Sequence, residues 1–324
     1  MTEYKQTESV TQISDNFVRM RDEVKRLIVG NDELIEMIVI AILSEGHILI
    51  EGVPGTAKTT LAKACAILSG CKFNRFQCSV DSQPADIIGI QFWNADTKEF
   101  EFKEGPIFTN FLLIDEINRL SPKTQSAFIE ALSEKQVTID SKREDLPNPF
   151  FTIATQNPME FEGTFPLIEA QKDRFMFSVF ATHLSGEDEL EVVRREQEGK
   201  LNWKKFSDTL STFMTQEAII ADIERVKQIH AGQDILSYIR DIVMATREHA
   251  DIALGSSSRG SIALLRGSRA KAALEQRDYV IPDDVKAIAL KALQHRIILK
   301  REAEISGTNS SAVIQQILDA VEVP

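Results

Sequence analysis

The sequence predicts an α/β domain with a parallel sheet flanked by helices, followed by a smaller domain made only of helices. In the first half of the chain, short apolar runs typical of buried strands alternate with segments of helical spacing. Such alternation is typical of parallel strands joined by right-handed crossovers. After about residue 181 the strand signals stop and long helical stretches follow. We therefore expect the α/β domain over residues 1–182 and the helical domain over residues 183–324.

The composition is that of a globular protein that folds without cross-links. The 324 residues are 43% hydrophobic and 27% charged, which suits about two domains. The three cysteines show no C-x-x-C spacing, which argues against a disulfide framework or a zinc site. A net charge of −12 disfavours a general affinity for nucleic acid or for an anionic membrane.

Nothing in the sequence predicts insertion into a membrane. The longest apolar run, LIEMIVIAIL, is interrupted by Glu36 and is too short to span a bilayer. The first residues are polar and lack the apolar core of a signal peptide. We therefore expect the protein in the cytoplasm.

The elements of the first domain follow from apolar runs and from helix boundaries. FLLIDE and FFTIATQN are continuous apolar runs, which suits strands buried on both faces. Ser121 followed by Pro122 is a typical helix start, because serine caps the helix and proline fits its first turn. We expect strands at residues 47–52, 73–80, 111–116, 150–157 and 175–180, and helices at 31–44, 59–68 and 121–133. In the second domain we expect helices within residues 186–199, 215–230, 235–253, 260–277 and 282–299.

Residues 51–60, EGVPGTAKTT, lie between a predicted strand and a predicted helix and nearly match the phosphate-loop pattern G-x-x-x-x-G-K-[ST]. Backbone N–H groups of such a loop cradle phosphate oxygens, Lys58 would neutralise the outer phosphates, and the Thr59 hydroxyl would hold Mg²⁺. Ala57 replaces the usual second glycine, but that residue already enters the helix with a negative φ, which alanine adopts without strain. The alternative is a chance turn. The expected nucleotide-binding residues are Gly52, Val53, Pro54, Gly55, Thr56, Ala57, Lys58, Thr59 and Thr60.

Polar residues end two of the predicted buried strands. Asp115 and Glu116 follow FLLI, where two carboxylates serve no core. Asp115 could bind Mg²⁺ and Glu116 could polarise the attacking water. Asn157 ends the next strand and could hold that water or contact the γ-phosphate. The alternatives are an ordinary exposed strand end for the carboxylates and a turn signal for Asn157-Pro158.

Together these segments resemble the MoxR family of AAA+ ATPases. The resemblance covers roughly residues 28–299 and is carried by GVPGTAKT, FLLIDEINR, SPKTQSAFIEAL, ATQNPMEFEGTFPLIEAQKDRF and GSSSRGSIALLRGSRAKAAL. It implies a homo-oligomeric ring, usually a hexamer, with ATP and Mg²⁺ at the subunit interfaces.

The resemblance also assigns roles position by position. It makes Lys58 and Thr59 the Walker A pair, Asp115 and Glu116 the Walker B pair, Asn157 sensor 1, Arg174 the arginine finger that reaches the neighbour's γ-phosphate, Arg259 sensor 2 acting within its own subunit, and Val29-Gly30 the segment over the adenine. From the residues alone, Arg174 would instead form a surface salt bridge with Asp173 or Glu169, and Gly30 would cap the following helix. The sequence departs from the commoner family residues at Ser258, Ile168 and Lys172.

Two insertions could contact a client. Residues 81–108 resemble the family's insertion in the second helix and contain Phe92, Trp93, Phe100 and Phe102. Residues 136–149 resemble the hairpin before sensor 1. In a ring both could face the pore or one rim, although such aromatics more often pack against their own domain. Lys142 and Arg143 are followed by two acidic residues, whereas a DNA-gripping hairpin would be more basic.

The resemblance implies an ATP-driven machine that assists the maturation of other proteins, often beside a von Willebrand factor A domain partner. Three alternatives remain at this point: a DNA-acting AAA+ motor, the motor subunit of a metal-inserting chelatase, and a scaffold that binds ATP with little turnover. The acidic balance of the chain counts against the first of these.

Overall fold

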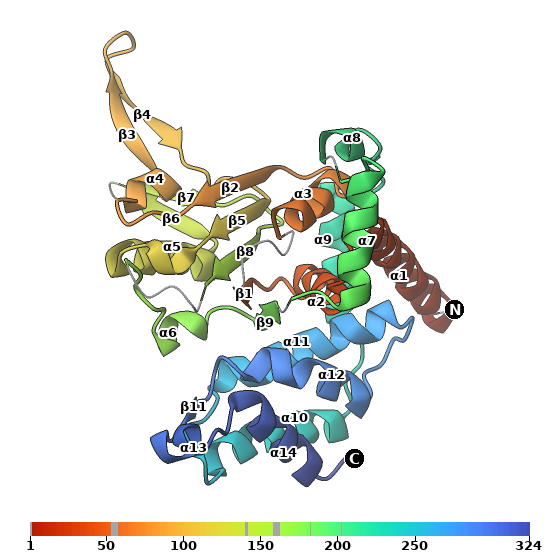
Figure 1. Ribbon diagram of the computed structural model, residues 1–324. Coiled ribbons are helices and arrows are strands. Elements are labelled where there is room, and N and C mark those ends of the chain that lie inside the picture. Colours follow the sequence, from red (N-terminus) through yellow and green to blue (C-terminus); the bar gives the residue numbers. More distant parts are fainter. Residues whose placement is uncertain (1, 53–57, 140–141, 158–162, 182, 202) are drawn as a thin grey trace.

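The computed structural model describes residues 2–52, 58–139, 142–157, 163–181, 183–201 and 203–324. A domain built on a sheet lies above a group of helices formed by the last third of the chain (Figure 1). None of the described helices combines the length and the apolar character needed to cross a bilayer.

The central sheet has five strands, and every neighbouring pair in it is parallel. Its order is β2 (Phe73–Gln77), β5 (Phe111–Asp115), β8 (Phe151–Gln156), β1 (Ile48–Gly52) and β9 (Phe177–Ala181). The middle strand β8 is buried along its whole length, and β5 is buried except at Asp115. The predicted parallel sheet is confirmed, and its continuous apolar strands are typical of strands that are buried on both faces.

Alternate residues of the strands serve two cores, one on each face of the sheet. Ile48, Ile50 and Leu113 belong to the larger core, which includes buried residues of α2 (Asp32–Leu43) and α3 (Lys58–Leu68). Leu49 and Leu112 point the other way, into the core shared with α5 (Pro122–Glu134). The predicted start of α5 is confirmed: the Ser121 hydroxyl accepts a hydrogen bond from the N–H of Thr124, with proline in the first turn.

The first helix, α1 (Thr2–Leu27), was not predicted. Its described core residues are Ile13, Phe17, Met20 and Val24, which are fully buried and spaced by three or four residues along one face. This stripe packs on α2, α3 and the second domain. Four core residues in a long, mostly polar segment were too sparse a signal to find.

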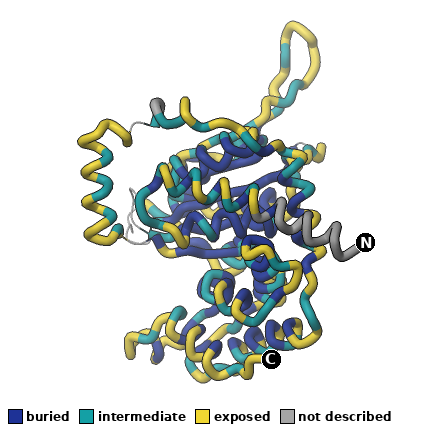
Figure 2. The backbone as a smooth tube through the Cα atoms, turned by 90° about the vertical axis from the view of Figure 1, so that its right-hand side faces the viewer, coloured by how far each residue is buried: buried dark blue, intermediate teal, exposed yellow. Residues whose placement is uncertain are grey.

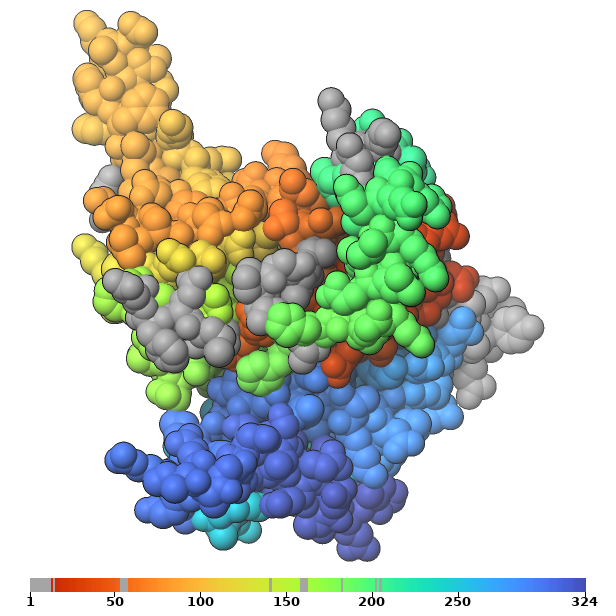
Figure 3. Space-filling model, in the orientation of Figure 1, coloured from red at the N-terminus to blue at the C-terminus, as the bar shows by residue number. Residues whose placement is uncertain are grey.

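Both insertions form antiparallel hairpins. The first follows α4 (Pro84–Ile88) and consists of β3 (Gly89–Asn94) and β4 (Glu99–Glu104). The second consists of β6 (Gln136–Ile139) and β7 (Lys142–Asp145). The β3–β4 hairpin projects clear of the body (Figures 1 and 3), and much of it is exposed (Figure 2).

The general expectation that the insertion aromatics pack on their own domain is wrong for three of the four. Phe92, Trp93 and Phe100 are 40%, 54% and 66% exposed. Phe102 alone packs inward, edge-on against Phe108 with ring centroids 5.4 Å apart. The reason lies in the geometry of the hairpin, because its outer part extends past the domain surface that could cover it.

The chain after residue 181 is largely helical, as predicted, with two corrections: the helices at residues 203–207, 301–305 and 310–320 were not expected, and a short pair of strands is present. Helix α6 (Glu169–Lys172) precedes β9, and the helices that follow are α7 (Gly186–Gln197), α8 (Trp203–Ser207), α9 (Gln216–Lys227), α10 (Gln233–Glu248), α11 (Ser258–Leu274), α12 (Pro282–Leu293), α13 (Arg301–Ile305) and α14 (Ser310–Ala320). The expected all-helical domain also contains β10 (Ile252–Leu254) paired with β11 (Ile298–Leu299). Strands of two or three residues are too short to show the alternation by which a strand is recognised.

Helix α9 packs against α1 and α2, while α10 to α14 form the body beneath the sheet (Figure 1). Helix α11 contacts α1 and α2, and α12 contacts β9, so the larger core continues from the sheet into the second half of the chain. The exact division of domains at residues 182 and 183 stays a prediction.

Candidate nucleotide site

The predicted phosphate loop joins β1 to α3. Gly52 ends β1 with a φ of 144°, and a Cβ atom there would lie 2.2 Å from the carbonyl oxygen of Ala181 on β9. Only glycine therefore fits at this position. Lys58, Thr59 and Thr60 form the first turn of α3, and the N-terminus of a helix favours an anion. The intervening loop residues, Val53, Pro54, Gly55, Thr56 and Ala57, lie outside the described residues.

Lys58 lies within electrostatic reach of both predicted carboxylates. Burial lowers the pKa of the Lys58 ammonium, and the negative charges of Asp115 and Glu116 act against that shift. The three groups come from different elements: Lys58 begins α3, Asp115 ends β5, and Glu116 follows it. The structure therefore brings Lys58, predicted to bind phosphate, near Asp115 and Glu116, predicted to bind Mg²⁺ and to polarise water.

A hydroxyl group that the sequence did not single out connects the two carboxylate residues. Thr155 of β8 donates a hydrogen bond from Oγ1 to Asp115 Oδ1 at 2.7 Å. Thr155 Oγ1 also accepts a hydrogen bond from the backbone N–H of Glu116 at 2.8 Å. Thr155 is only 2% exposed, so this bridge fixes the two residues from beneath. Its sequence signal was weak, since it is one polar residue in the strand that precedes Asn157.

Glu116 has an unusual backbone conformation. Its φ of 60° and ψ of 55° lie in the left-handed region, which is rare for residues other than glycine, and such residues cluster at functional sites. Its carboxylate meets Arg119 at 2.8 Å between Oε2 and Nε, and accepts a hydrogen bond from Gln77 Nε2 at 3.1 Å. Gln77 ends the neighbouring strand β2 and was not singled out from the sequence.

Asp115 also has a cationic partner from β2. Arg75 lies 2.6 Å from Asp115 Oδ2, measured from its terminal nitrogen. Together with Lys58 and Arg119, it surrounds the carboxylates with positive charge. Such a site suits a polyanion, whose negative charge lysine, arginine and a divalent cation would together neutralise.

Asn157 lies directly after β8, on the same edge of the sheet as Asp115 and Glu116. Its carbonyl oxygen accepts a hydrogen bond at 3.3 Å from the side chain of Asn118, two residues after Glu116. Asn157 therefore lies close to the segment that carries Glu116, as its expected place near the attacking water requires. Its catalytic role stays a prediction.

The described residues contain no group of three or more His, Cys, Asp or Glu side chains placed to hold a metal. Thr59 and Asp115 fit a magnesium site in which phosphate oxygens and water supply most of the ligands, as Mg²⁺ prefers. When bound, the ion would neutralise charge that develops on the phosphates.

Val29 and Gly30, predicted to lie over the adenine, precede α2. Gly30 has a φ of 68°, and a Cβ atom there would lie 2.8 Å from Leu184 Cδ2. The glycine therefore permits close packing of the segment before α7, and the alternative of a helix-capping glycine is compatible with this. Contact with adenine stays a prediction.

The two predicted arginines, Arg174 and Arg259, lie near the amino ends of the strands, opposite to the carboxyl ends where Asp115 and Glu116 lie. Ile48 at the start of β1 pairs with Phe177, and Gly52 at its end pairs with Ala181. The two ends of β1 are about 13 Å apart, at about 3.3 Å per residue. Arg174 precedes β9 by three residues and so lies beyond the amino end of the strands, whereas Lys58 lies beyond their carboxyl end.

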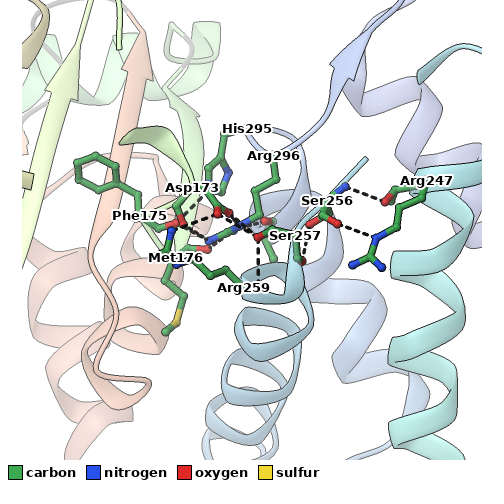
Figure 4. A network of polar contacts seen from close by, with 11 residues as sticks. Asp173, Phe175, Met176, Arg247, Ser256, Ser257, Arg259, His295 and Arg296 are labelled. Atoms are coloured by element: carbon green, nitrogen blue, oxygen red, sulfur yellow. Dashed lines mark hydrogen bonds and ion pairs between the residues drawn. The ribbon is translucent and has the colours of Figure 1, made fainter. Parts of the chain in front are cut away.

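Arg259 lies at the same edge as Arg174, held by the side chain of Asp173 (Figure 4). Its guanidinium is 3.3 Å from Asp173 Oδ2. Among the described residues, Asp173 pairs with Arg259 and Arg296 and not with Arg174, so the salt bridge considered as an alternative role for Arg174 is not formed with this carboxylate. Within this chain, Arg259 lies near the amino end of β9, whereas Lys58 lies beyond the carboxyl end of β1.

Comparisons with known proteins agree with this geometry. The family model "ATPase family associated with various cellular activities (AAA)" matches residues 47–177, and the model "AAA lid domain" matches residues 244–317. The protein YeaC of Bacillus subtilis is 42% identical over 94% of this chain and 93% of its own length. Chaperone MoxR1 of Mycobacterium tuberculosis is 37% identical over 93% of this chain and 81% of its own. A crystal structure from Cytophaga hutchinsonii matches with a TM-score of 0.91 and 38% identity, covering 100% of this chain and 99% of that one.

Proposed function

Since this chain belongs to the MoxR family of AAA+ ATPases, we propose that it hydrolyses ATP at the subunit interfaces of a homo-oligomeric ring and uses the motion to remodel partner proteins. The chain is an ATPase with a chaperone-like relative. The finer proposal concerns where the site is completed and what the motion acts on. We expect a hexamer in the cytoplasm, with a von Willebrand factor A domain protein among its partners.

The observation that carries the interface proposal is the separation of the two halves of the site. Lys58, Asp115 and Glu116 lie at the carboxyl ends of the strands, and Arg174 lies beyond their amino ends. One subunit cannot bring these groups to the same phosphate. Head-to-tail contact between copies can, because a heterologous interface joins two different faces and closes into a ring.

The position of Arg259 changes its expected action. The resemblance implied contact with the γ-phosphate of its own subunit, but Arg259 is held by Asp173, the residue that precedes Arg174 in the chain. We therefore propose that both arginines act on the nucleotide of the neighbouring subunit. Such a pair would stabilise the charge of the transition state, where one arginine finger is worth about 10³–10⁵ in rate.

The chemistry within the subunit follows from the described contacts. Lys58 and the first turn of α3 would hold the phosphates, and Thr59 and Asp115 would hold Mg²⁺. Glu116 would orient the attacking water, with Asn157 beside it. Thr155, Gln77 and Arg119 fix the two carboxylate residues before the nucleotide arrives.

The interface site is tested by mixing two inactive variants. Glu116→Gln removes the carboxylate from the Walker side, and Arg174→Ala removes the arginine of the opposite face. In rings mixed at random, about one site in four combines an intact carboxylate with an intact arginine. We expect the mixture to hydrolyse ATP much faster than either variant alone. A mixture no faster than the sum of its components would contradict the proposal.

For the partner surface we propose the exposed end of the β3–β4 hairpin. Trp93 and Phe100 pair edge-on, with ring centroids 5.2 Å apart, and both are exposed on a hairpin that projects from the body. Exposed aromatics of this kind are typical of binding anchors. Changing both to alanine should leave basal ATP hydrolysis unchanged and abolish capture of a partner by Glu116→Gln rings in ATP. Unchanged capture would exclude the hairpin, and the matched control is Phe180→Ala, an exposed aromatic outside the hairpin.

A further inference from the structure

We propose that Asp173 is a positioning residue through which the second domain sets the two arginines of the interface. The proposal rests on the proposed function, because it concerns how Arg174 and Arg259 are presented to a neighbouring subunit. Asp173 precedes Arg174 in the chain, and three side chains of the second domain meet its carboxylate (Figure 4).

The strongest of these contacts comes from Arg296, just after α12. Its side chain is 2% exposed and lies 2.9 Å from Asp173 Oδ1, measured from Nε. Burial lowers the pKa of Arg296 to about 10, with the negative charge of Asp173 acting in the opposite direction. Because a buried guanidinium needs an anion and several acceptors, this pair is fixed in place.

Arg296 also holds the backbone on both sides of Arg174. Its two terminal nitrogens donate to the carbonyl oxygens of Asp173 at 3.2 Å, Phe175 at 2.6 Å and Met176 at 2.9 Å. His295 adds a hydrogen bond to the same Phe175 oxygen at 3.0 Å. The segment that carries Arg174 is thus attached to the end of α12, and any displacement of that helix moves the arginine.

The remaining contacts come from the start of α11. Ser257 donates from Oγ to Asp173 Oδ2 at 2.9 Å and accepts the N–H of Arg259 at 3.1 Å. Arg259 completes the group at 3.3 Å from Oδ2. A single carboxylate therefore connects α11, α12 and the segment of Arg174.

The two arginines on Asp173 differ in how easily they can leave it. Arg296 is buried, whereas the Arg259 side chain is 50% exposed, and exposed ion pairs contribute little. Arg259 can exchange the carboxylate for a phosphate of the neighbouring subunit while Arg296 keeps the segment in place. In this arrangement Asp173 holds Arg259 ready when no neighbouring nucleotide is bound.

The test is Asp173→Asn, which keeps the shape and removes the charge. Because a displacement of about 1 Å can cost 10²-fold in rate, we expect kcat to fall about 10- to 100-fold. The affinity for MgATP should change less than about twofold, since the nucleotide is held mainly by the subunit's own loop. Asp173→Glu, which retains a carboxylate, should recover part of the lost rate.

Rings assembled from two variants distinguish a loss of arginine positioning from damage to the fold. Rings of Asp173→Asn and Glu116→Gln should regain activity, because intact arginines then face intact carboxylates. Arg174→Ala mixed with Glu116→Gln is the control. If the control mixture gains no ATPase activity, the interface site itself is refuted. If the control mixture gains activity and the Asp173→Asn mixture does not, only the role of Asp173 is refuted. An unchanged kcat in Asp173→Asn alone also refutes only the role of Asp173.

Loss of the Asp173 charge leaves Arg296 buried without its anion, so the Asp173→Asn protein could fail to fold. A second variant therefore tests the proposal independently. Arg296→Lys keeps the charge but cannot reach the carboxylate and three carbonyl oxygens at once. It should lower kcat and regain activity in the mixture in the same way. Wild-type kcat in a folded Arg296→Lys protein would overturn the proposal.

Discussion

Replacing Thr155 with valine removes one hydroxyl from beneath the nucleotide site and should slow ATP hydrolysis without changing the fold. Valine has nearly the same shape, and Thr155 is 2% exposed, so the packing of β8 is kept. The hydrogen bonds to Asp115 at 2.7 Å and from the Glu116 N–H at 2.8 Å are lost. The change thus acts on the two carboxylate residues and on little else.

The expected loss of kcat follows from the two residues that these hydrogen bonds hold in place, Asp115 and Glu116. A buried group left without its partner costs about 1–3 kcal/mol, and since Asp115 keeps Arg75, the lower part of that range applies. A left-handed backbone at a residue such as Glu116 costs of order 1–3 kcal/mol and persists only where the surroundings hold it. A loss of about 1–2 kcal/mol in the transition state corresponds to a kcat roughly 5- to 30-fold lower.

Steady-state ATP hydrolysis measures the effect, with MgATP affinity from calorimetry and stability from thermal unfolding. The matched control is Thr152→Val on the same strand. Thr152 is fully buried, and among the described residues its hydroxyl has no hydrogen-bond partner, so this change should leave kcat unaltered. An unchanged kcat in Thr155→Val, or an equal loss in both variants, would show that the Thr155 hydroxyl does not support the two carboxylate residues.

Two further predictions concern stability. Burial lowers the pKa of His47 to about 4 and that of His295 in the same direction, so the folded protein binds fewer protons than the unfolded chain between about pH 6.5 and 4, and stability falls as the pH decreases through that window. For His47 the loss is roughly 2 kcal/mol at pH 5; denaturant unfolding at pH 7 and pH 5 measures it, and a His47→Gln variant with the same pH-dependent loss as the wild type would contradict it. Gly52→Ala should prevent folding or destabilise by several kcal/mol, because the new Cβ atom would overlap the carbonyl oxygen of Ala181, whereas Gly186→Ala, with open space around it, should be neutral or gain about 0.4–1 kcal/mol. Equal unfolding midpoints for the two alanine variants would contradict this.

The sheet was predictable because its strands are buried on both faces. The runs at residues 111–116 and 150–157 could be placed within a residue or two of β5 and β8, since a short continuous apolar run bounded by polar residues is typical of a fully buried strand. The stripe of α1 and the pairing of β10 with β11 were missed, because four core residues in a polar helix and strands of two or three residues leave little periodic signal.

The residues of the candidate site were predictable where a motif fixes them and not where tertiary structure selects them. Lys58, Asp115 and Glu116 come together as expected. Thr155 and Gln77 reach the carboxylate residues only because β2, β5 and β8 are adjacent, an order that no local pattern reveals. Asp173 meets side chains 84 and 123 residues away, so its contacts belong to the fold and not to a motif.

The most direct measurement compares wild-type protein and Glu116→Gln in MgATP, by calorimetry for binding and by phosphate release for hydrolysis. Both proteins should bind MgATP with similar affinity, because Lys58 and the start of α3 are unchanged, and hydrolysis should fall about 10²- to 10⁴-fold in the variant. Equal hydrolysis rates in the two proteins, or no binding of MgATP by either, would contradict the proposed nucleotide site.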